Sequence, residues 1–292
     1  MDLPVAPAPP LETVPMTVLR PARQTVPVIF ASPHSGRAYP PDFLAAARLD
    51  ALNLRRSEDS FVDELFSAAP DFGAPLLAAT FPRAFCDANR EPWELDPAMF
   101  ADPLPSWVNT TSPRVGAGLG TIARIVASGE TIYRGKLPFS EAERRVQLFW
   151  RPFHETLEAL ISGTRAMFGF CLLVDCHSMP SHGGGRAGGK AEFVLGDAHG
   201  TTCNPAVTAF IEQRLSLLGY IVRRNDPYAG GYITRHYGRP REQVHVVQLE
   251  IARELYMDEQ RIERLPRFAG VQQDLTVLIE ALAAAAGRLL LR

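Results

Sequence analysis

The sequence has few cysteines, and none of them stands in a CxxC pair. Four cysteines in 292 residues are too sparse for a secreted disulfide scaffold, and no zinc-finger spacing is present. We therefore expect reduced thiols and a cytoplasmic protein.

An excess of positive charge is also missing. The chain carries 30 Lys and Arg against 32 Asp and Glu, and this balance gives no basic surface that would attract a phosphate backbone. No stretch approaches the roughly 18 consecutive apolar residues of a membrane span, and the N-terminus lacks the features of a signal peptide. We expect no nucleic-acid partner, no membrane insertion and no export.

What the chain does contain is enough apolar sequence for a large core. At 46% hydrophobic, its 292 residues fit one compact α/β domain, which we expect over residues 21–292. Five prolines lie among the first fifteen residues. Because proline lacks a backbone donor, we expect residues 1–20 to form a flexible arm.

Short apolar runs alternate with longer amphipathic stretches, a pattern typical of strands separated by helices. It predicts a three-layer α/β fold, with a central mostly parallel or mixed sheet and helices on both faces. The predicted strands are 26–31, 74–80, 168–174 and 244–249. The predicted helices are 40–54, 57–69, a long stretch opened by a Ser140–Glu143 capping box and interrupted at Pro152, one capped by Asn204 and Pro205 that ends near Gly219, and 275–291.

Two histidines follow predicted strands at matching positions. His34 stands in SPHSG, after the strand at 26–31, and His177 stands in VDCHS, after the strand at 168–174. A lone histidine is more often a hydrogen-bonded structural residue. Because ligands collect at the carboxyl ends of the strands in an open α/β sheet, two histidines at such ends indicate one shared site.

A catalytic zinc needs a third ligand of N or O type and an open position for water, so we expect a carboxylate to join the histidines. Glu58 and Asp59 are both candidates, and the residues alone leave the choice open. Two acids at a helix start could also serve the helix dipole alone. Glu250 follows the predicted strand at 244–249, where a carboxylate beside a metal can act as a general base toward water.

A further group of residues is typical of anion recognition. Guanidinium groups bind carboxylates in a bidentate way that lysine does not match. Most arginines lie on the surface, but those of this group stand in loops marked by Pro, Asn or Gly, which favours a functional role. The group comprises Arg83, Asn89 and Arg90 in PRAFCDANREP, and Thr234, Arg235 and His236 in GGYITRHYG.

Taken in their order along the chain, these motifs resemble those of N-formylglutamate amidohydrolases. The resemblance extends over residues 26–259, whereas the glycine-rich segment 183–190 and the region 100–136 match less clearly. The resembling segments are SPHSG (32–36), DANR (87–90), WRPFH (150–154), LLVDCHS (172–178), FVLGDAHGTTCNP (193–205), GGYITRHYG (230–238) and VQLEIARELYMDE (247–259).

The resemblance implies a phosphorylase/hydrolase-like fold of the zinc exopeptidase type, related to zinc carboxypeptidases. It also implies a metal held by His, a carboxylate and His, which His34, Asp59 and His177 match. Asp59 is preferred because the family has an aspartate there, and Glu58 remains the alternative ligand. Glu250 matches a catalytic glutamate late in the chain.

We therefore expect metal-dependent hydrolysis of the formyl amide of N-formyl-L-glutamate, as in histidine degradation, with Zn²⁺ or another divalent metal as cofactor. Arg90 and Arg235 are expected to anchor the two carboxylates of this small anionic substrate, and Arg83 or Arg90 to polarise the formyl carbonyl. The alternatives are a metal-dependent hydrolase of another N-acyl amino acid or peptide end, and a metal-free protein that binds a dicarboxylate.

Overall fold

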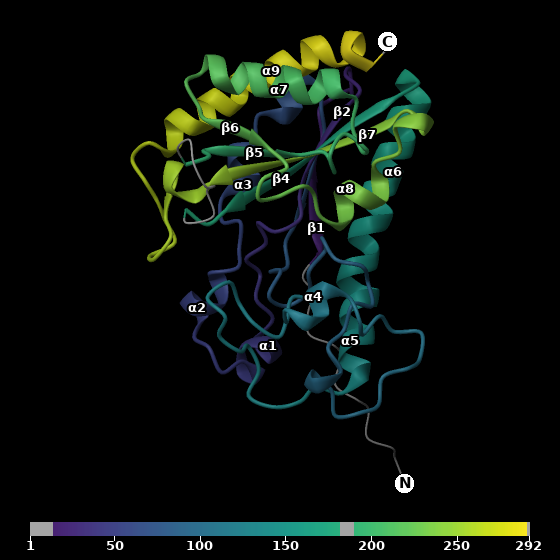
Figure 1. Ribbon diagram of the computed structural model, residues 1–292, viewed down its shortest axis with the longest axis vertical. Helices are drawn as coiled ribbons and strands as arrows, with labels where there is room; N and C mark the ends of the chain where they lie inside the picture. The colour runs from purple at the N-terminus through teal and green to yellow at the C-terminus, as the bar shows by residue number, and fades with distance from the viewer. Residues whose placement is uncertain (1–13, 182–189, 291–292) are drawn as a thin grey trace.

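A seven-stranded mixed sheet forms the centre of the computed structural model, which describes residues 14–181 and 190–290 (Figure 1). The strand order is β1-β3-β2-β4-β7-β5-β6. The strands β3, β2, β4 and β7 are parallel neighbours, whereas β1 runs antiparallel to β3 and β5 runs antiparallel to β7 but parallel to β6. The strands are β1 (Met16–Leu19), β2 (Val28–Ser32), β3 (Leu76–Ala79), β4 (Cys171–Met179), β5 (Phe193–Gly196), β6 (Val222–Arg224), β7 (Val244–Ala252), and the separate pair β8 (Met257–Asp258) and β9 (Glu263–Arg264).

Helices cover both faces of this sheet. Helices α7 and α9 lie together over one face, and the long helix α6 lies against the other (Figure 1). The α-helices are α1 (Pro41–Ala46), α2 (Ala51–Arg55), α3 (Val62–Leu65), α4 (Pro113–Gly116), α5 (Phe139–Arg145), α6 (Arg151–Phe168), α7 (Pro205–Leu217), α8 (Tyr232–Tyr237) and α9 (Phe268–Leu290). Four 3₁₀ turns (Ala69–Phe72, Pro97–Met99, Pro240–Glu242, Arg253–Leu255) and one π turn (Val146–Trp150) complete the set in the described residues.

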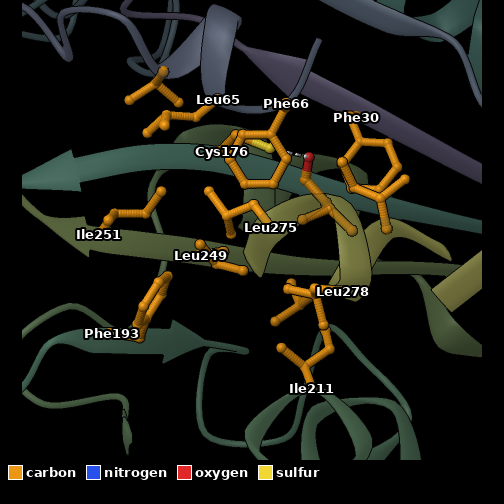
Figure 2. Close-up of a cluster of buried hydrophobic side chains, with 14 of the residues drawn as sticks. Phe30, Leu65, Phe66, Cys176, Phe193, Ile211, Leu249, Ile251, Leu275 and Leu278 are labelled. Atoms are coloured by element: carbon orange, nitrogen blue, oxygen red, sulfur yellow. Dashed lines mark hydrogen bonds between the residues drawn. The ribbon is translucent and has the colours of Figure 1, made fainter. Parts of the chain in front are cut away.

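Two apolar clusters, one on each face of the sheet, form the core. On the first face, Phe30 of β2 and Leu249 of β7 pack with Ile211 of α7 and with α9, as Figure 2 shows. On the second face, alternate residues of the same strands pack against Phe153 and Leu157 of α6. Burying both faces of a parallel sheet requires near-continuous apolar strands, and the predicted three-layer α/β fold is confirmed.

The four predicted strands are present as β2, β3, β4 and β7, but the last two are longer than predicted. β4 continues to Met179 and β7 to Ala252, so His177 and Glu250 lie within strands rather than after them. The apolar run ends earlier than the strand does because polar side chains occupy the carboxyl ends of both strands. Strands β5 and β6 were not predicted.

The predicted helix 40–54 is wrong in its extent, because it divides into α1 and α2. Between them, Ala47 is extended and pairs with Tyr133, and Arg48 N donates to Ile132 O (2.8 Å). The predicted helix 57–69 shrinks to α3. Pairing with distant segments has overridden local helical spacing at both places.

The predicted Ser140–Glu143 capping box is also wrong. Helix α5 begins at Phe139 without a side-chain cap from its N-cap residue, and Phe139 N instead donates to Asp102 Oδ2 (2.9 Å). The interruption at Pro152 takes the form of the π turn just before it, which precedes a proline that cannot donate within the helix. The cap at Asn204 is confirmed, since its Oδ1 accepts from Ala206 N (2.9 Å).

The arm predicted for residues 1–20 needs a correction at its end. Strand β1 (Met16–Leu19) lies within that range and pairs antiparallel with β3, so this part of the chain belongs to the sheet. Residues 1–13 and most of the glycine-rich segment 183–190 lie outside the described residues. In the described parts of the chain, no helix is both long and apolar enough to cross a membrane.

The connection between β3 and β4 is largely irregular before α5, and Arg145 ties it to the helical layer. Arg145 is buried, and its Nη1 donates to Phe85 O (2.9 Å) and to the Tyr133 hydroxyl (2.6 Å). Its Nε donates to Glu141 (2.6 Å), which balances the charge. Arg145 thus holds in place a segment with little regular structure, which carries Arg83, Asn89 and Arg90.

The loop after β2 leaves no room for a side chain at Gly36. A Cβ there would lie 2.1 Å from Phe81 O and 2.6 Å from the backbone of Thr80. We predict that Gly36→Ala lowers the free energy of unfolding by about 2 kcal/mol or more, because the backbone at the end of β3 must move. Denaturant unfolding measures this loss.

The matched control is Gly163→Ala in the interior of α6, where an added Cβ meets nothing within 4 Å. This variant should be neutral or more stable by up to about 1 kcal/mol, because alanine favours helix. Equal stability of the two variants would contradict the close approach at Gly36.

Candidate active site

Polar side chains replace apolar ones on one face of the sheet at the carboxyl ends of β4 and β7. Leu173 and Val246 belong to the core on that face, whereas Asp175, His177 and Glu250 continue it as polar residues. His177 and Glu250 are register partners in the parallel pair. Since side chains alternate along a strand, neighbouring register partners present both groups on the same face.

The carboxyl end of β2 lies at the same edge of the sheet and is followed by His34. It lies just beyond β2, and its backbone carbonyl accepts a hydrogen bond from Asp59 N (3.0 Å). Phe61, with φ of 68°, turns the chain sharply before α3. This backbone contact, rather than a helix start, directs the Asp59 carboxylate toward the two histidines.

The three predicted metal ligands converge. One potential ligand atom from each of His34, Asp59 and His177 lies within 4.8 Å of the others, and all three residues are buried. Asp59 Oδ2 lies 3.0 Å from His177 Nδ1 and 3.4 Å from His34 Nδ1. Both histidines therefore turn the same ring nitrogen toward the carboxylate.

The hydrogen bonds around His34 fit a metal ligand. Its Nε2 donates to Asp87 Oδ1 (2.7 Å), which leaves the lone pair on Nδ1. That Nδ1 is buried and has no hydrogen-bond partner in the described residues. A buried unpartnered nitrogen is costly unless something binds it. The group could therefore hold a metal, with Asp87 as the carboxylate that orients the histidine.

His177 and Asp59 are oriented from behind in a similar way. His177 Nε2 lies 3.0 Å from Asp175 Oδ1 and 3.1 Å from Asn89 Nδ2. Asp59 Oδ1 accepts from Ser178 Oγ (3.2 Å) and Arg253 Nη2 (3.1 Å), so only Oδ2 faces the histidines. Supporting contacts of this kind fix ligand geometry.

Electrostatics at the site follow from these pairs. Burial acts to raise the pKa of Asp59, but the hydrogen bond from His177 and the closeness of the His34 ring hold it well below its usual range. Burial opposes charge on His177, yet Asp175 and Asp59 raise its pKa well above the usual value. The carboxylates around His177 therefore favour its protonated form, and a metal bound at this ring would have to compete with that proton.

Glu250 lies beside this group and, within the described residues, takes part in none of the ion pairs that His34, Asp59 and His177 form. Burial raises the pKa of Glu250 to about 7, against the opposing charge of His177. Its Oε1 accepts from Gln248 Nε2 (2.7 Å), whose Oε1 accepts from Gly231 N (2.8 Å). A carboxylate held so, with a pKa near neutrality, can take and return a proton.

The group lies in a cleft of about 460 Å³ that also holds five arginines. Arg83 Nη2 donates to Asp87 Oδ2 (2.7 Å). Arg90 is buried, and within the part of the chain that the structure describes it donates only to backbone carbonyls, those of Leu119 (2.9 Å) and Asn89 (2.7 Å). Arg235 is exposed on α8, and no side-chain partner is found for it in the described chain. The remaining two are Arg114 and Arg253.

Most predicted site residues line this cleft, but three do not. Glu58 is bound by the Tyr39 hydroxyl (2.6 Å), by Ser60 and by Arg55, and it takes no part in the metal group. The Thr234 hydroxyl lies against Asp175 (3.4 Å), and His236 stacks on Tyr232. The geometry thus favours Asp59 over Glu58, and Thr234 supports the sheet end rather than the cleft surface.

The sequence reasoning missed four residues of the site. Asp175 and Gln248 stand two positions before His177 and Glu250, so alternation along a longer strand would have placed them on the same face. Arg253 follows β7 directly, yet nothing local indicates that it reaches Asp59. Arg114 lies in a region without a recognisable motif.

Comparisons with known proteins place the chain among related sequences. The profile of the N-formylglutamate amidohydrolase family matches residues 26–257. An N-formylglutamate deformylase from Pseudomonas aeruginosa is 33% identical over 82% of this chain and 85% of its own length. One from Pseudomonas putida is 31% identical over 80% and 83%. The crystal structure of N-formylglutamate amidohydrolase from Ralstonia eutropha JMP134 superposes with a TM-score of 0.90 at 38% identity, covering 94% of this chain and 99% of that one.

The contact between Asp87 and His34 predicts an effect on metal affinity. We expect Asp87→Asn to weaken divalent metal binding by about 10- to 100-fold, because the histidine loses its orienting carboxylate. Competition with a chromogenic chelator measures this. Asp71→Asn, the same charge change at an exposed position, should bind like the wild type. Unchanged affinity in Asp87→Asn would count against the metal group.

Proposed function

Because the chain belongs to the N-formylglutamate amidohydrolase family, we propose that it hydrolyses the formyl amide of N-formyl-L-glutamate to formate and L-glutamate. The observation that carries this proposal is the register pairing of His177 with Glu250 beside the unpartnered Nδ1 of His34. This arrangement supports a metal ligand set with an adjacent proton acceptor. The reaction would serve histidine degradation, and four cysteines without disulfides accord with a cytoplasmic enzyme.

His34, Asp59 and His177 are the residues that would hold the metal. Bound there, Zn²⁺ or a similar divalent metal would supply Lewis-acid chemistry, lowering the pKa of water and polarising a carbonyl. The mixed N and O donor set is compatible with zinc and with other divalent metals.

Glu250 has the central proton-transfer role in this proposal. It takes a proton from the water that attacks the formyl carbon, and it returns that proton to the glutamate nitrogen as the carbon–nitrogen bond breaks. Its burial keeps its proton affinity high enough for both steps. The hydrogen bond from Gln248 fixes the direction in which it faces.

Three arginines and Asn89 position the substrate. Arg83 is assigned to the formyl oxygen because it lines the cleft beside the metal group, where it pairs with Asp87, the carboxylate that also holds His34. Arg90 and Arg235 are assigned to the two carboxylates, since neither is neutralised by an acid within the described residues. Asn89 Oδ1 accepts from Ile233 N (2.8 Å), so this residue joins the two walls of the cleft.

Metal removal is the first test of this function. Formate release from N-formyl-L-glutamate should fall to background after chelation, because the attacking water loses its activation, and it should return with Zn²⁺. Comparing kcat/KM for N-formylglutamate, N-acetylglutamate and a C-terminal dipeptide defines the substrate. A clear preference for either of the last two would contradict the proposed substrate, and glutamate binding without turnover would indicate a binding protein.

Replacing Glu250 separates proton transfer from metal binding. We expect Glu250→Gln to lower kcat by at least about 100-fold while bound metal stays at the wild-type level, because the amide cannot accept the proton. Metal analysis and formate release on the same sample measure both. Glu263→Gln, an exposed glutamate on β9, is the matched control. Near-normal kcat in Glu250→Gln would assign the base elsewhere.

A further inference from the structure

The cleft holds more cations than its own acids neutralise. It is lined by five arginines and by three acids, Asp59, Asp87 and Glu250. Arg83 pairs with Asp87 and Arg253 pairs with Asp59, which leaves three arginines against the single carboxyl of Glu250. Such an excess is compensated when an anionic ligand enters.

Two of the three remaining arginines, Arg90 and Arg114, are joined through Leu119. Arg90 Nε donates to Leu119 O (2.9 Å), and Leu119 N donates to Arg114 O (2.8 Å), so Leu119 links the side chain of Arg90 to the backbone of Arg114. Both arginines line the same cleft. Burial lowers the pKa of Arg90, and the charges of Arg83 and Arg114 lower it further. No carboxylate of the described chain contacts either side chain, and Arg114 itself is exposed.

The wall beside these arginines is apolar. Leu119, Ala123, Ile125 and Ala127 line the cleft from the same segment that carries Arg114. A small apolar surface next to two cations fits an anionic group on a short aliphatic arm, because the methylenes are removed from water while the charge meets the guanidinium groups. Arg235 lies on a different element, α8.

We infer that Arg114 is a specificity-determining residue, which binds the side-chain carboxylate of the substrate together with Arg90 and selects an acidic over a neutral side chain. The inference rests on the proposed function and deepens it. The apolar wall receives the two side-chain methylenes, and Arg235 is left for the α-carboxylate. The sequence alone predicted neither the role of Arg114 nor which arginine binds which carboxylate of the substrate.

The test compares an acidic substrate with its neutral isostere. In the full-length protein, Arg114→Gln should lower kcat/KM for N-formyl-L-glutamate by about tenfold to hundredfold, the usual worth of hydrogen bonds to a charged group. For N-formyl-L-glutamine the change should stay within about twofold. Lys136→Gln removes the same charge at an exposed position outside the cleft and serves as the control.

A binding measurement separates this inference from the proposed function. Calorimetric titration of wild type and Arg114→Gln with L-glutamate and with L-glutamine reports the same selectivity without turnover. If the wild type binds glutamate but releases no formate, the proposed function fails and the glutamate-over-glutamine ratio still decides the role of Arg114. The inference would be overturned if Arg114→Gln had the same ratio of glutamate to glutamine affinity as the wild type. It would also be overturned if the variant lost kcat/KM equally for N-formyl-L-glutamate and N-formyl-L-glutamine.

Discussion

The contact of Asp59 with two buried histidines is the interaction on which the site depends. One carboxylate oxygen faces Nδ1 of His34 and of His177, while the other is held by Ser178 and Arg253. His34, Asp59, the His177–Ser178 pair and Arg253 come from four separate parts of the chain, and the sheet brings them together by placing the ends of β2, β4 and β7 side by side. The fold and the chemistry therefore share one constraint, which is the parallel packing of three strand ends at one edge.

The unpartnered Nδ1 of His34 distinguishes this cluster from a purely structural one. A fully hydrogen-bonded cluster of the same residues could be purely structural, because every buried polar group would be satisfied. Here Asp87 fixes the proton on the far side of the ring and leaves the near side without a partner. His34, Asp59 and His177 would hold a divalent metal in a way that satisfies this nitrogen, with Glu250 as the adjacent carboxylate.

Much of the sheet could be predicted because buried strands read as apolar runs. The site residues His34, His177 and Glu250 were found because they end such runs, and Asp59 because the family pattern prefers it. The positions of α1 and α2 could not be predicted, since pairing of Ala47 with Tyr133 breaks a stretch that looks helical by itself. Arg253 contacts Asp59, 194 residues earlier in the chain, and Arg114 reaches the cleft only through the fold of an irregular segment. Local sequence pattern does not indicate either position.

The most direct test of the central claim is the position of a bound metal, determined from anomalous scattering of crystals grown with Zn²⁺. We predict one strong peak between His34 Nδ1, Asp59 Oδ2 and His177 Nδ1, at roughly 2.0 to 2.2 Å from each ligand atom. A peak at any other position, or coordination through Nε2 of either histidine, would contradict the account.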